Sequence, residues 1–148
     1  MRVLLAVDGS ECSQKAVEEV ATRIWRKGTK IKVFAVATSR IPEWFMDPAF
    51  ATSAAHEVQV EEHHLKLNKL VKEIKSSLES SGQGENLEIE TKVVEDYPKE
   101  AIVDEAESWN ADLVIVGAHG YGKIKRIFLG SVSQFVSLYA PCSVQIVR

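Results

Sequence analysis

Residues 113–120 read Leu-Val-Ile-Val-Gly-Ala-His-Gly, and nine residues further on residues 130–133 read Gly-Ser-Val-Ser. Four apolar residues that run into a glycine are typical of a buried parallel strand that ends at the edge of a sheet. Gly117 lacks a Cβ, so the backbone can turn sharply there and a ligand can approach it closely. A helix that begins after Gly130 would add free N–H groups and a partial positive charge, which together bind phosphate. The stretch therefore predicts an anion-binding cradle between a strand and a helix.

The same stretch also matches part of a P-loop, the phosphate-binding loop of P-loop NTPases. Residues 117–123 fit the first part of that motif, but Ile124 occupies the position at which Ser or Thr holds Mg²⁺. Because the metal ligand is missing, we do not expect a P-loop NTPase.

The composition is ordinary for a soluble globular protein. The 148 residues favour a single domain over residues 1–148 with a sizeable core. A net charge of −3 without a long basic run gives no indication of a nucleic-acid partner. The two cysteines, Cys12 and Cys142, do not form a disulfide framework and do not have the spacing of metal ligands. The apolar run at 3–7 is too short for a signal peptide or a membrane span. We therefore expect a cytoplasmic protein without membrane contact.

Hydrophobic periodicity predicts strands that alternate with helices along the chain. The expected strands are 3–7, 31–36, 87–93, 113–117 and 143–148, with 87–93 at an edge of the sheet. The first helix is expected to begin at Ser10 or Ser13 and to end at Gly28. The later helices are expected to begin at about His56, at Asp96 and Pro98, and after Gly130. Their expected buried positions are Ala16, Val17, Val20, Ala21, Ile24, Leu67, Leu70, Val71, Ile74, Leu78, Ala101, Ile102, Ala106, Trp109, Val132, Phe135, Val136 and Tyr139.

This order of elements predicts an α/β fold: an open, doubly wound, Rossmann-like sheet of five parallel strands with helices on both faces. A strand order of 3-2-1-4-5 places the reversal of strand order between the first and fourth strands, where ligands bind in such sheets. The turn at Asp8 and the loop at Gly117 would then face each other across one crevice.

With these residues the chain resembles the universal stress protein family over essentially its full length. The matching pieces are Val3–Ser10 with Ser13 and Ala16, Ala101-Ile102 after Pro98, Asp112–Gly117, Gly117-x2-Gly120-x9-Gly130-Ser131-Val132-Ser133, and Ala140-Pro141-Cys142. The glycine pattern is similar to that of the family's ATP-binding branch. Two positions depart from the family pattern: Ser143 replaces the usual proline after the cysteine, and Glu95-Asp96-Tyr97 replaces a glycine common after the third strand.

The resemblance implies a nucleotide site and the residues that form it. The phosphates and ribose would be held by Gly117, Gly120, Gly130, Ser131 and Ser133, with Val132 contributing through its backbone. Asp8 would lie near the nucleoside with Ala6 beside it, and Val36 would line the adenine pocket. His119 lies inside the phosphate loop. The implied ligand is ATP or AMP, with Mg²⁺ or Mn²⁺ on the phosphates or at Asp8 and no metal site made by the protein alone. The family also implies a homodimer, which we expect to form through the C-terminal strand.

Each of these residues has a simpler structural interpretation. Asp8, Ser131 and Ser133 can cap helices instead of binding a ligand, and His119 can be merely exposed. The basic residues Lys123, Lys125 and Arg126 can belong to a solvated loop. The aromatic residues Trp44, Phe45 and Phe50 can cover the pocket, contact a partner or pack on their own domain. The residues His56, Glu61, Glu62, His63 and His64 lack a metal-binding spacing, so we expect a surface helix there.

The function that follows is an adenine-nucleotide-binding regulatory or signalling module of the stress response, with regulatory protein partners that the sequence does not identify. One alternative is a slow ATPase or phosphoryl-transfer enzyme that uses the same cradle, although the sequence has no nucleophile elbow or telling pair of carboxylates. The other is a dimeric adaptor that needs no nucleotide.

Overall fold

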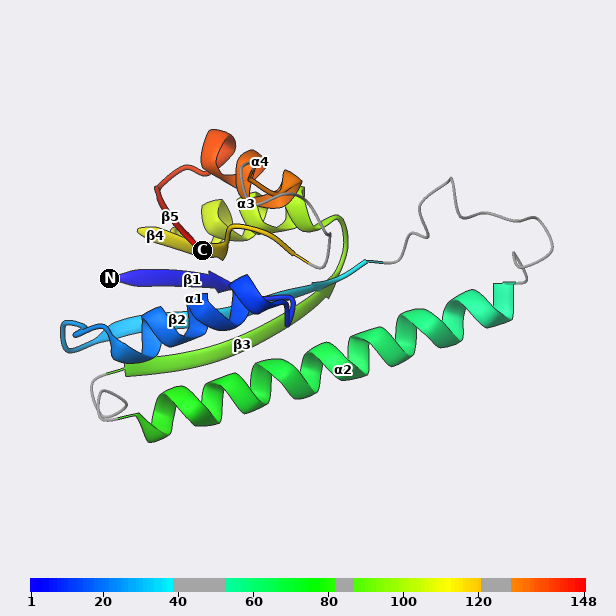
Figure 1. Ribbon diagram of the computed structural model, residues 1–148, viewed down its shortest axis with the longest axis horizontal. Helices are drawn as coiled ribbons and strands as arrows, with labels where there is room; N and C mark the ends of the chain where they lie inside the picture. The colour runs from blue at the N-terminus through cyan, green and yellow to red at the C-terminus, as the bar shows by residue number, and fades with distance from the viewer. Residues whose placement is uncertain (39–52, 82–86, 121–128) are drawn as a thin grey trace.

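The computed structural model describes residues 1–38, 53–81, 87–120 and 129–148, with side chains in its second helix described from Glu61 onward. The elements in chain order are β1 (Arg2–Ala6), α1 (Glu11–Thr22), β2 (Thr29–Ala37), α2 (Ser53–Ser80), β3 (Leu87–Glu95), α3 (Pro98–Ser108), β4 (Leu113–Gly117), α4 (Ser131–Tyr139) and β5 (Ser143–Val147). These strands form one parallel sheet in the order β3-β2-β1-β4-β5 (Figure 1). The predicted fold class and strand order are therefore confirmed.

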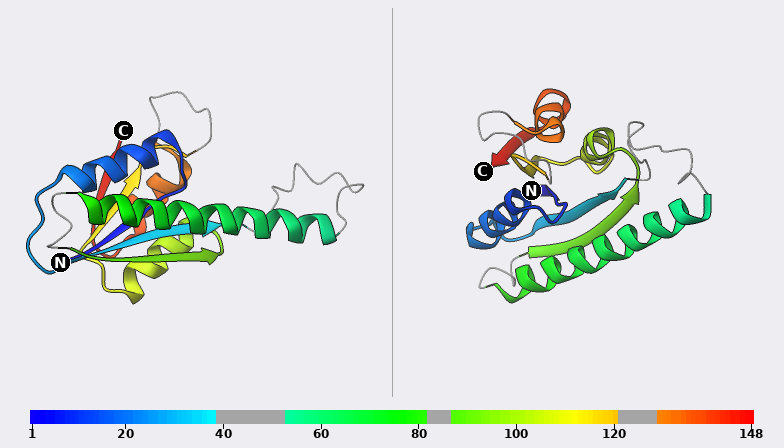
Figure 2. Two further views of the ribbon diagram at one scale, coloured as in Figure 1. Left: turned by 90° about the horizontal axis from the view of Figure 1, so that it is seen from below. Right: turned by 45° about the vertical axis from the view of Figure 1, so that its right-hand side comes forward.

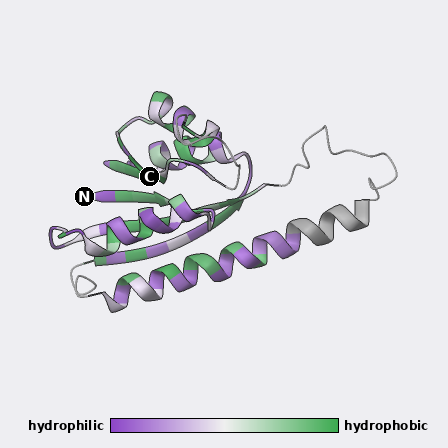
Figure 3. Cartoon of the chain, viewed as in Figure 1, coloured by the Kyte–Doolittle hydropathy of each residue, from purple (hydrophilic) through white to green (hydrophobic). Residues whose placement is uncertain are grey.

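Two layers of helices cover the sheet. Helices α1 and α2 pack on one face and α3 and α4 on the other, and Figure 2 shows the two pairs on opposite sides of the strands. Because alternate residues of a strand point to opposite faces, Val3 and Leu5 of β1 lie under α1 and α2, whereas Leu4 lies under α3 and α4. All three are 0% exposed, which explains why the central strands are continuously apolar (Figure 3).

Helix α2 is 28 residues long, and the part whose side chains are described, from Glu61 onward, carries a buried stripe. Leu67, Val71, Ile74 and Leu78 are buried at the predicted spacing, and Leu70 is half-buried beside them. The amino-terminal end of α2 extends past the carboxyl ends of the strands (Figure 1). The predicted edge position of β3 is confirmed, because β3 pairs only with β2 among the described strands.

The end of α1 differs from the prediction. The helix ends at Thr22, because Arg23 at its C-cap is already extended, and Ile24 is 85% exposed rather than buried. Trp25 fills the core instead: it is 6% exposed, and its indole N–H donates to the carbonyl of Val20 at 2.8 Å. Gly28 does not end the helix but occupies the turn before β2, with φ +79°.

Two further helix positions differ from the prediction. Tyr139 is 61% exposed, because α4 buries Ser133 and Val136 on its inner side and stacks Tyr139 on Phe135 with ring centroids 4.5 Å apart. Helix α3 ends at Ser108, so Trp109 is its half-buried C-cap rather than a residue of the helix.

Candidate functional site

A cavity of about 330 Å³ opens at the carboxyl ends of β1, β2 and β4, where the strand order reverses. This is the position at which open doubly wound sheets bind ligands. All ten residues proposed from the sequence line the cavity: Ala6, Asp8, Val36, Gly117, His119, Gly120, Gly130, Ser131, Val132 and Ser133. The structure thus brings together residues from the two ends of the chain, as the strand order predicted.

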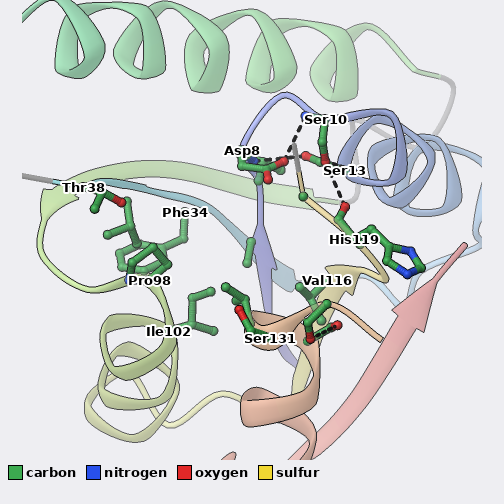
Figure 4. A pocket seen from close by; sticks show the side chains of 18 of the residues that line it. Asp8, Ser10, Ser13, Phe34, Thr38, Pro98, Ile102, Val116, His119 and Ser131 are labelled. Carbon is green, nitrogen blue, oxygen red and sulfur yellow. Dashed lines mark hydrogen bonds between the residues drawn. The ribbon is translucent and has the colours of Figure 1, made fainter. Parts of the chain in front are cut away.

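The turn after β1 forms one wall of the cavity. Ser10 is the N-cap of α1: its hydroxyl oxygen accepts from the N–H of Ser13 at 3.3 Å, and the hydroxyl donates to the carbonyl of His119 at 3.2 Å. Oδ1 of Asp8 accepts from the N–H of Ser10 at 2.9 Å. Of the two candidates, Ser10 rather than Ser13 is therefore the cap, and Asp8 stabilises the turn with one carboxylate oxygen (Figure 4).

The loop after β4 returns to its starting point before α4 begins. The N–H of Gly130 donates to the carbonyl of Ala118 at 2.8 Å, and the N–H of Ala118 donates to Val147 of β5 at 2.7 Å. The hydroxyl of Ser133 is within 2.9 Å of the carbonyl oxygens of both Ala118 and Gly130, and the residue is 2% exposed. Ser133 therefore fastens the start of α4 to the end of β4.

The glycines serve the packing of the protein itself. A Cβ on Gly117 would lie 2.7 Å from the backbone carbon of Cys12 and 2.8 Å from the nitrogen of Ser13. A Cβ on Gly130 would lie 3.1 Å from the carbonyl oxygen of Ala118. The side of Gly117 on which a Cβ would lie is thus packed against the first turn of α1, while Gly117 also lines the cavity.

The start of α4 faces the cavity without a side-chain cap. Gly130 is the N-cap and has no side chain that could bond the N–H groups of the first turn, which in any helix lack intrahelical partners. Ser131, the first residue of the helix, is exposed and lines the cavity. Among the described residues no side chain caps this helix N-terminus, so its N–H groups could bind an anion.

The opposite part of the cavity is apolar. Six of its lining residues belong to the hydrophobic core between the sheet and α3 and α4: Ala6, Phe34, Val36, Ile102, Val116 and Val132. Pro98, at the start of α3, lies beside them (Figure 4). An apolar part of a ligand would be sheltered from water here, and polar groups of the same ligand could reach Asp8 and Ser131.

The cavity also has lining residues that were not predicted as site residues, among them Phe34, Thr38, His63, Leu67, Pro98 and Ile102. Thr38 could have been found, because it follows β2 at the carboxyl edge of the sheet. His63 and Leu67 come from α2, whose path relative to the cavity is not encoded by any local pattern. The one available signal was that His63 precedes the buried Leu67 by four residues and shares its side of the helix.

Apart from His63, the remaining candidates do not line this cavity or lie beyond the described residues. Within the described ranges, no three His, Cys, Asp or Glu side chains are grouped as metal ligands. Glu61, Glu62 and His63 are exposed and His64 is half-buried, as expected for the surface of a helix. Several candidates fall outside the described ranges: the basic residues Lys123, Lys125 and Arg126, the aromatic residues Trp44, Phe45 and Phe50, and the side chain of His56. No helix in the described part of the chain is long and apolar enough to cross a membrane.

The two cysteines are free and half-buried. Burial, and then the charge of Asp112, raise the pKa of the Cys142 thiol above its ordinary value. A raised pKa keeps the thiol neutral and poorly reactive near pH 7, which fits a packing role for Cys142.

Fold and site together define a doubly wound α/β protein with a ligand cavity at its topological switch point. The model of the universal stress protein family matches residues 1–148, and the chain belongs to that family. A universal stress protein of Synechocystis sp. is 28% identical over 99% of this chain and 97% of its own length. Another from Thermus aquaticus is 30% identical over 99% of this chain and 97% of its own length.

Solved structures share the fold. Universal stress protein UspA from Lactobacillus plantarum superposes with a TM-score of 0.80 at 20% identity and covers 100% of this chain and 97% of its own. An Arabidopsis thaliana family member with AMP bound has a TM-score of 0.57 at 19% identity over 99% of this chain and 90% of its own. A universal stress protein from Archaeoglobus fulgidus in complex with dAMP has a TM-score of 0.60 at 21% identity over 100% of this chain and 98% of its own.

Proposed function

We propose that this chain binds an adenine nucleotide, ATP or AMP, in the cavity at the β1–β4 switch point and acts as a nucleotide-dependent regulatory module. The observation that carries the proposal is the convergence, on one cavity, of an apolar compartment, the carboxylate of Asp8 and the uncapped N-terminus of α4. The structural neighbours that hold AMP and dAMP support an adenine nucleotide as the ligand.

Each part of the nucleotide has a matching part of the cavity. The base would lie in the apolar compartment against Val36 and Ile102, and the ribose would lie near Asp8. The phosphates would bind at the start of α4, where Ser131 is exposed and its hydroxyl makes no hydrogen bond to a described residue. The hydroxyl proton of Ser133 is already directed to backbone carbonyls, so Ser133 would reach a phosphate only through its N–H.

A divalent cation, Mg²⁺ or Mn²⁺, would be bound mainly by the phosphates. The second oxygen of Asp8 has no hydrogen-bond partner among the described residues and is the protein ligand best suited to a hard cation here. Binding regulates the protein only to the extent that the nucleotide favours one conformation or assembly over another.

The test is calorimetric titration of nucleotide-stripped protein with ATP, ADP and AMP, each with and without Mg²⁺. The test variant is Gly120→Val, because Gly120 lines the cavity and a bulky side chain there would obstruct the phosphates and Asp8. A matched control is Ser143→Val, which adds a similar side chain at an exposed position at the amino end of β5.

Saturable binding that Gly120→Val abolishes and Ser143→Val retains, with both variants folded by circular dichroism, is the expected result. Absence of binding by the native protein would overturn the proposal and favour the dimeric adaptor. Turnover of ATP that persists through purification and disappears in Gly120→Val would instead add hydrolysis to the proposed binding.

A further inference from the structure

Helix α2 supplies a wall of the cavity. His63 and Leu67 line it, and they lie one helical turn apart on the same side of α2. Leu67 is 4% exposed and packs into the core between α2 and the sheet, which fixes the rotation of the helix about its axis. His63 therefore lies on the side of α2 that faces the cavity. Figure 4 shows α2 running across the same side of the cavity as the turn that carries Asp8.

Apart from His119, and from Ser131 at the start of α4, the polar side chains of the cavity divide into two groups. The hydroxyls of Ser10, Ser13 and Ser133 bond backbone groups of the turn and the loop. The imidazole of His63, the hydroxyl of Thr38 and Oδ2 of Asp8 make no hydrogen bond or ion pair with the described residues. Thr38 and His63 are exposed and Asp8 is half-buried, so these atoms can still bond a ligand in the cavity.

The position of this second group matches the sugar of a nucleotide rather than its phosphates. The N-terminus of α4, which would bind the phosphates, and the apolar compartment, which would hold the base, both lie on the face of the sheet covered by α3 and α4. His63 comes from the helix that covers the other face, and Asp8 follows the central strand between the two faces. A nucleotide with its base and phosphates on the α3–α4 side would turn its ribose hydroxyls toward Asp8 and His63.

We propose that His63 is a specificity-determining residue that binds the ribose together with Asp8, so that this chain prefers ribonucleotides to deoxyribonucleotides. The inference rests on the proposed nucleotide-binding function. A ribose hydroxyl is both a donor and an acceptor; the carboxylate of Asp8 accepts, and the imidazole can donate with one nitrogen and accept with the other. A 2′-deoxyribose leaves one of these protein groups without its partner.

The experiment measures dissociation constants of AMP and 2′-deoxy-AMP for the wild type and three variants. His63→Leu removes both imidazole nitrogens, and His63→Gln keeps a donor and an acceptor. His64→Leu is the matched control, because His64 is the next residue of the same helix and does not line the cavity. The thermal midpoint of each variant reports whether it is folded.

The wild type is expected to bind AMP about 3- to 10-fold more tightly than 2′-deoxy-AMP, the worth of one solvent-exposed hydrogen bond. His63→Leu is expected to lose that preference, because the substitution weakens the binding of AMP and leaves the binding of 2′-deoxy-AMP unchanged. His63→Gln is expected to restore part of the preference. His64→Leu is expected to bind both nucleotides as the wild type does. If the wild type binds neither ligand, the proposed function itself fails. If the wild type binds AMP but His63→Leu leaves the ratio of the two constants unchanged, nucleotide binding stands and the role of His63 is wrong.

Discussion

A Cβ atom on Gly120 would lie 2.7 Å from Oδ2 of Asp8, so the glycine loop and the turn after β1 are in contact at the mouth of the cavity. The next atom of Asp8 would be 4.0 Å away, so the close approach involves the end of the carboxylate only. Because Oδ1 is bonded to the N–H of Ser10, the carboxylate cannot move away without losing that bond. Gly120 thus determines where Asp8 can place its free oxygen.

Gly120→Ala is therefore expected to weaken nucleotide binding by displacing Asp8 rather than by blocking the phosphates. We expect roughly a 10-fold loss of affinity, the order of one hydrogen bond to a charged group, with little change in thermal stability. A double-mutant cycle with Asp8→Ala checks the mechanism: once the carboxylate is absent, Gly120→Ala should change the affinity little. Strictly additive effects of the two substitutions would show that Gly120 acts on the ligand directly.

Gly117→Ala is expected to affect stability instead of binding. The added Cβ would lie 2.7 Å and 2.8 Å from backbone atoms of Cys12 and Ser13, which cannot rotate away as a side chain can. The expected loss is about 1–3 kcal/mol of unfolding free energy, measured by urea denaturation. Gly28→Ala isolates the conformational part of such a change, because a Cβ there meets nothing within 4 Å although φ is +79°. Equal losses in the two variants would rule out the clash with α1.

The sequence predicted the parts of this protein that depend on short-range patterns. Buried strands are continuously apolar, and the strand order then places Asp8 beside Gly117, so most of the cavity follows from the topology. The predicted end of α1 was wrong because a tertiary contact determines where the helix ends: Trp25 rather than Ile24 is buried in the core. The wall formed by His63 was missed for a related reason, since it depends on where a long helix lies against a distant turn.

The C-terminal strand is expected to mediate a homodimer. Among the described strands β5 pairs only with β4, so its other edge presents backbone N–H and C=O groups that a second copy can pair. Light scattering after size exclusion should give twice the 16.4 kDa chain mass at micromolar concentration. Hydrogen exchange should show amide protection in 143–147 that increases with protein concentration. A monomeric mass at all concentrations, or protection of 143–147 that does not depend on concentration, would contradict this interface.

Glu105 is expected to be a major determinant of stability. It is 6% exposed, and its carboxylate accepts hydrogen bonds from Lys32, at 2.7 Å, and from Lys92. Glu105→Gln would remove the buried negative charge that pairs with the Lys32 ammonium, and among the described residues it would leave Lys32 with Glu90, at 3.1 Å, as its charged partner beside the ring of Trp109. We expect a loss of about 3 kcal/mol in urea denaturation at pH 7. The exposed Glu107→Gln on the same helix should change stability by less than about 0.5 kcal/mol, and equal effects of the two substitutions would contradict the prediction.

The same ion pairs predict how stability depends on pH. Burial opposes the charged form of Glu105, but the hydrogen bonds and charges of Lys32 and Lys92 outweigh it, so the pKa of Glu105 lies below its ordinary value. A carboxylate with a lowered pKa in the folded state stabilises the protein fully above the ordinary glutamate pKa of about 4.3, and this contribution is lost as the pH falls through the folded-state pKa. The difference in unfolding free energy between the wild type and Glu105→Gln should therefore be constant from pH 8 to 6 and should narrow below about pH 4. Urea denaturation at a series of pH values measures it; a difference that already narrows between pH 8 and 6, or persists unchanged to pH 3, would show that Glu105 is not held ionised by the two lysines.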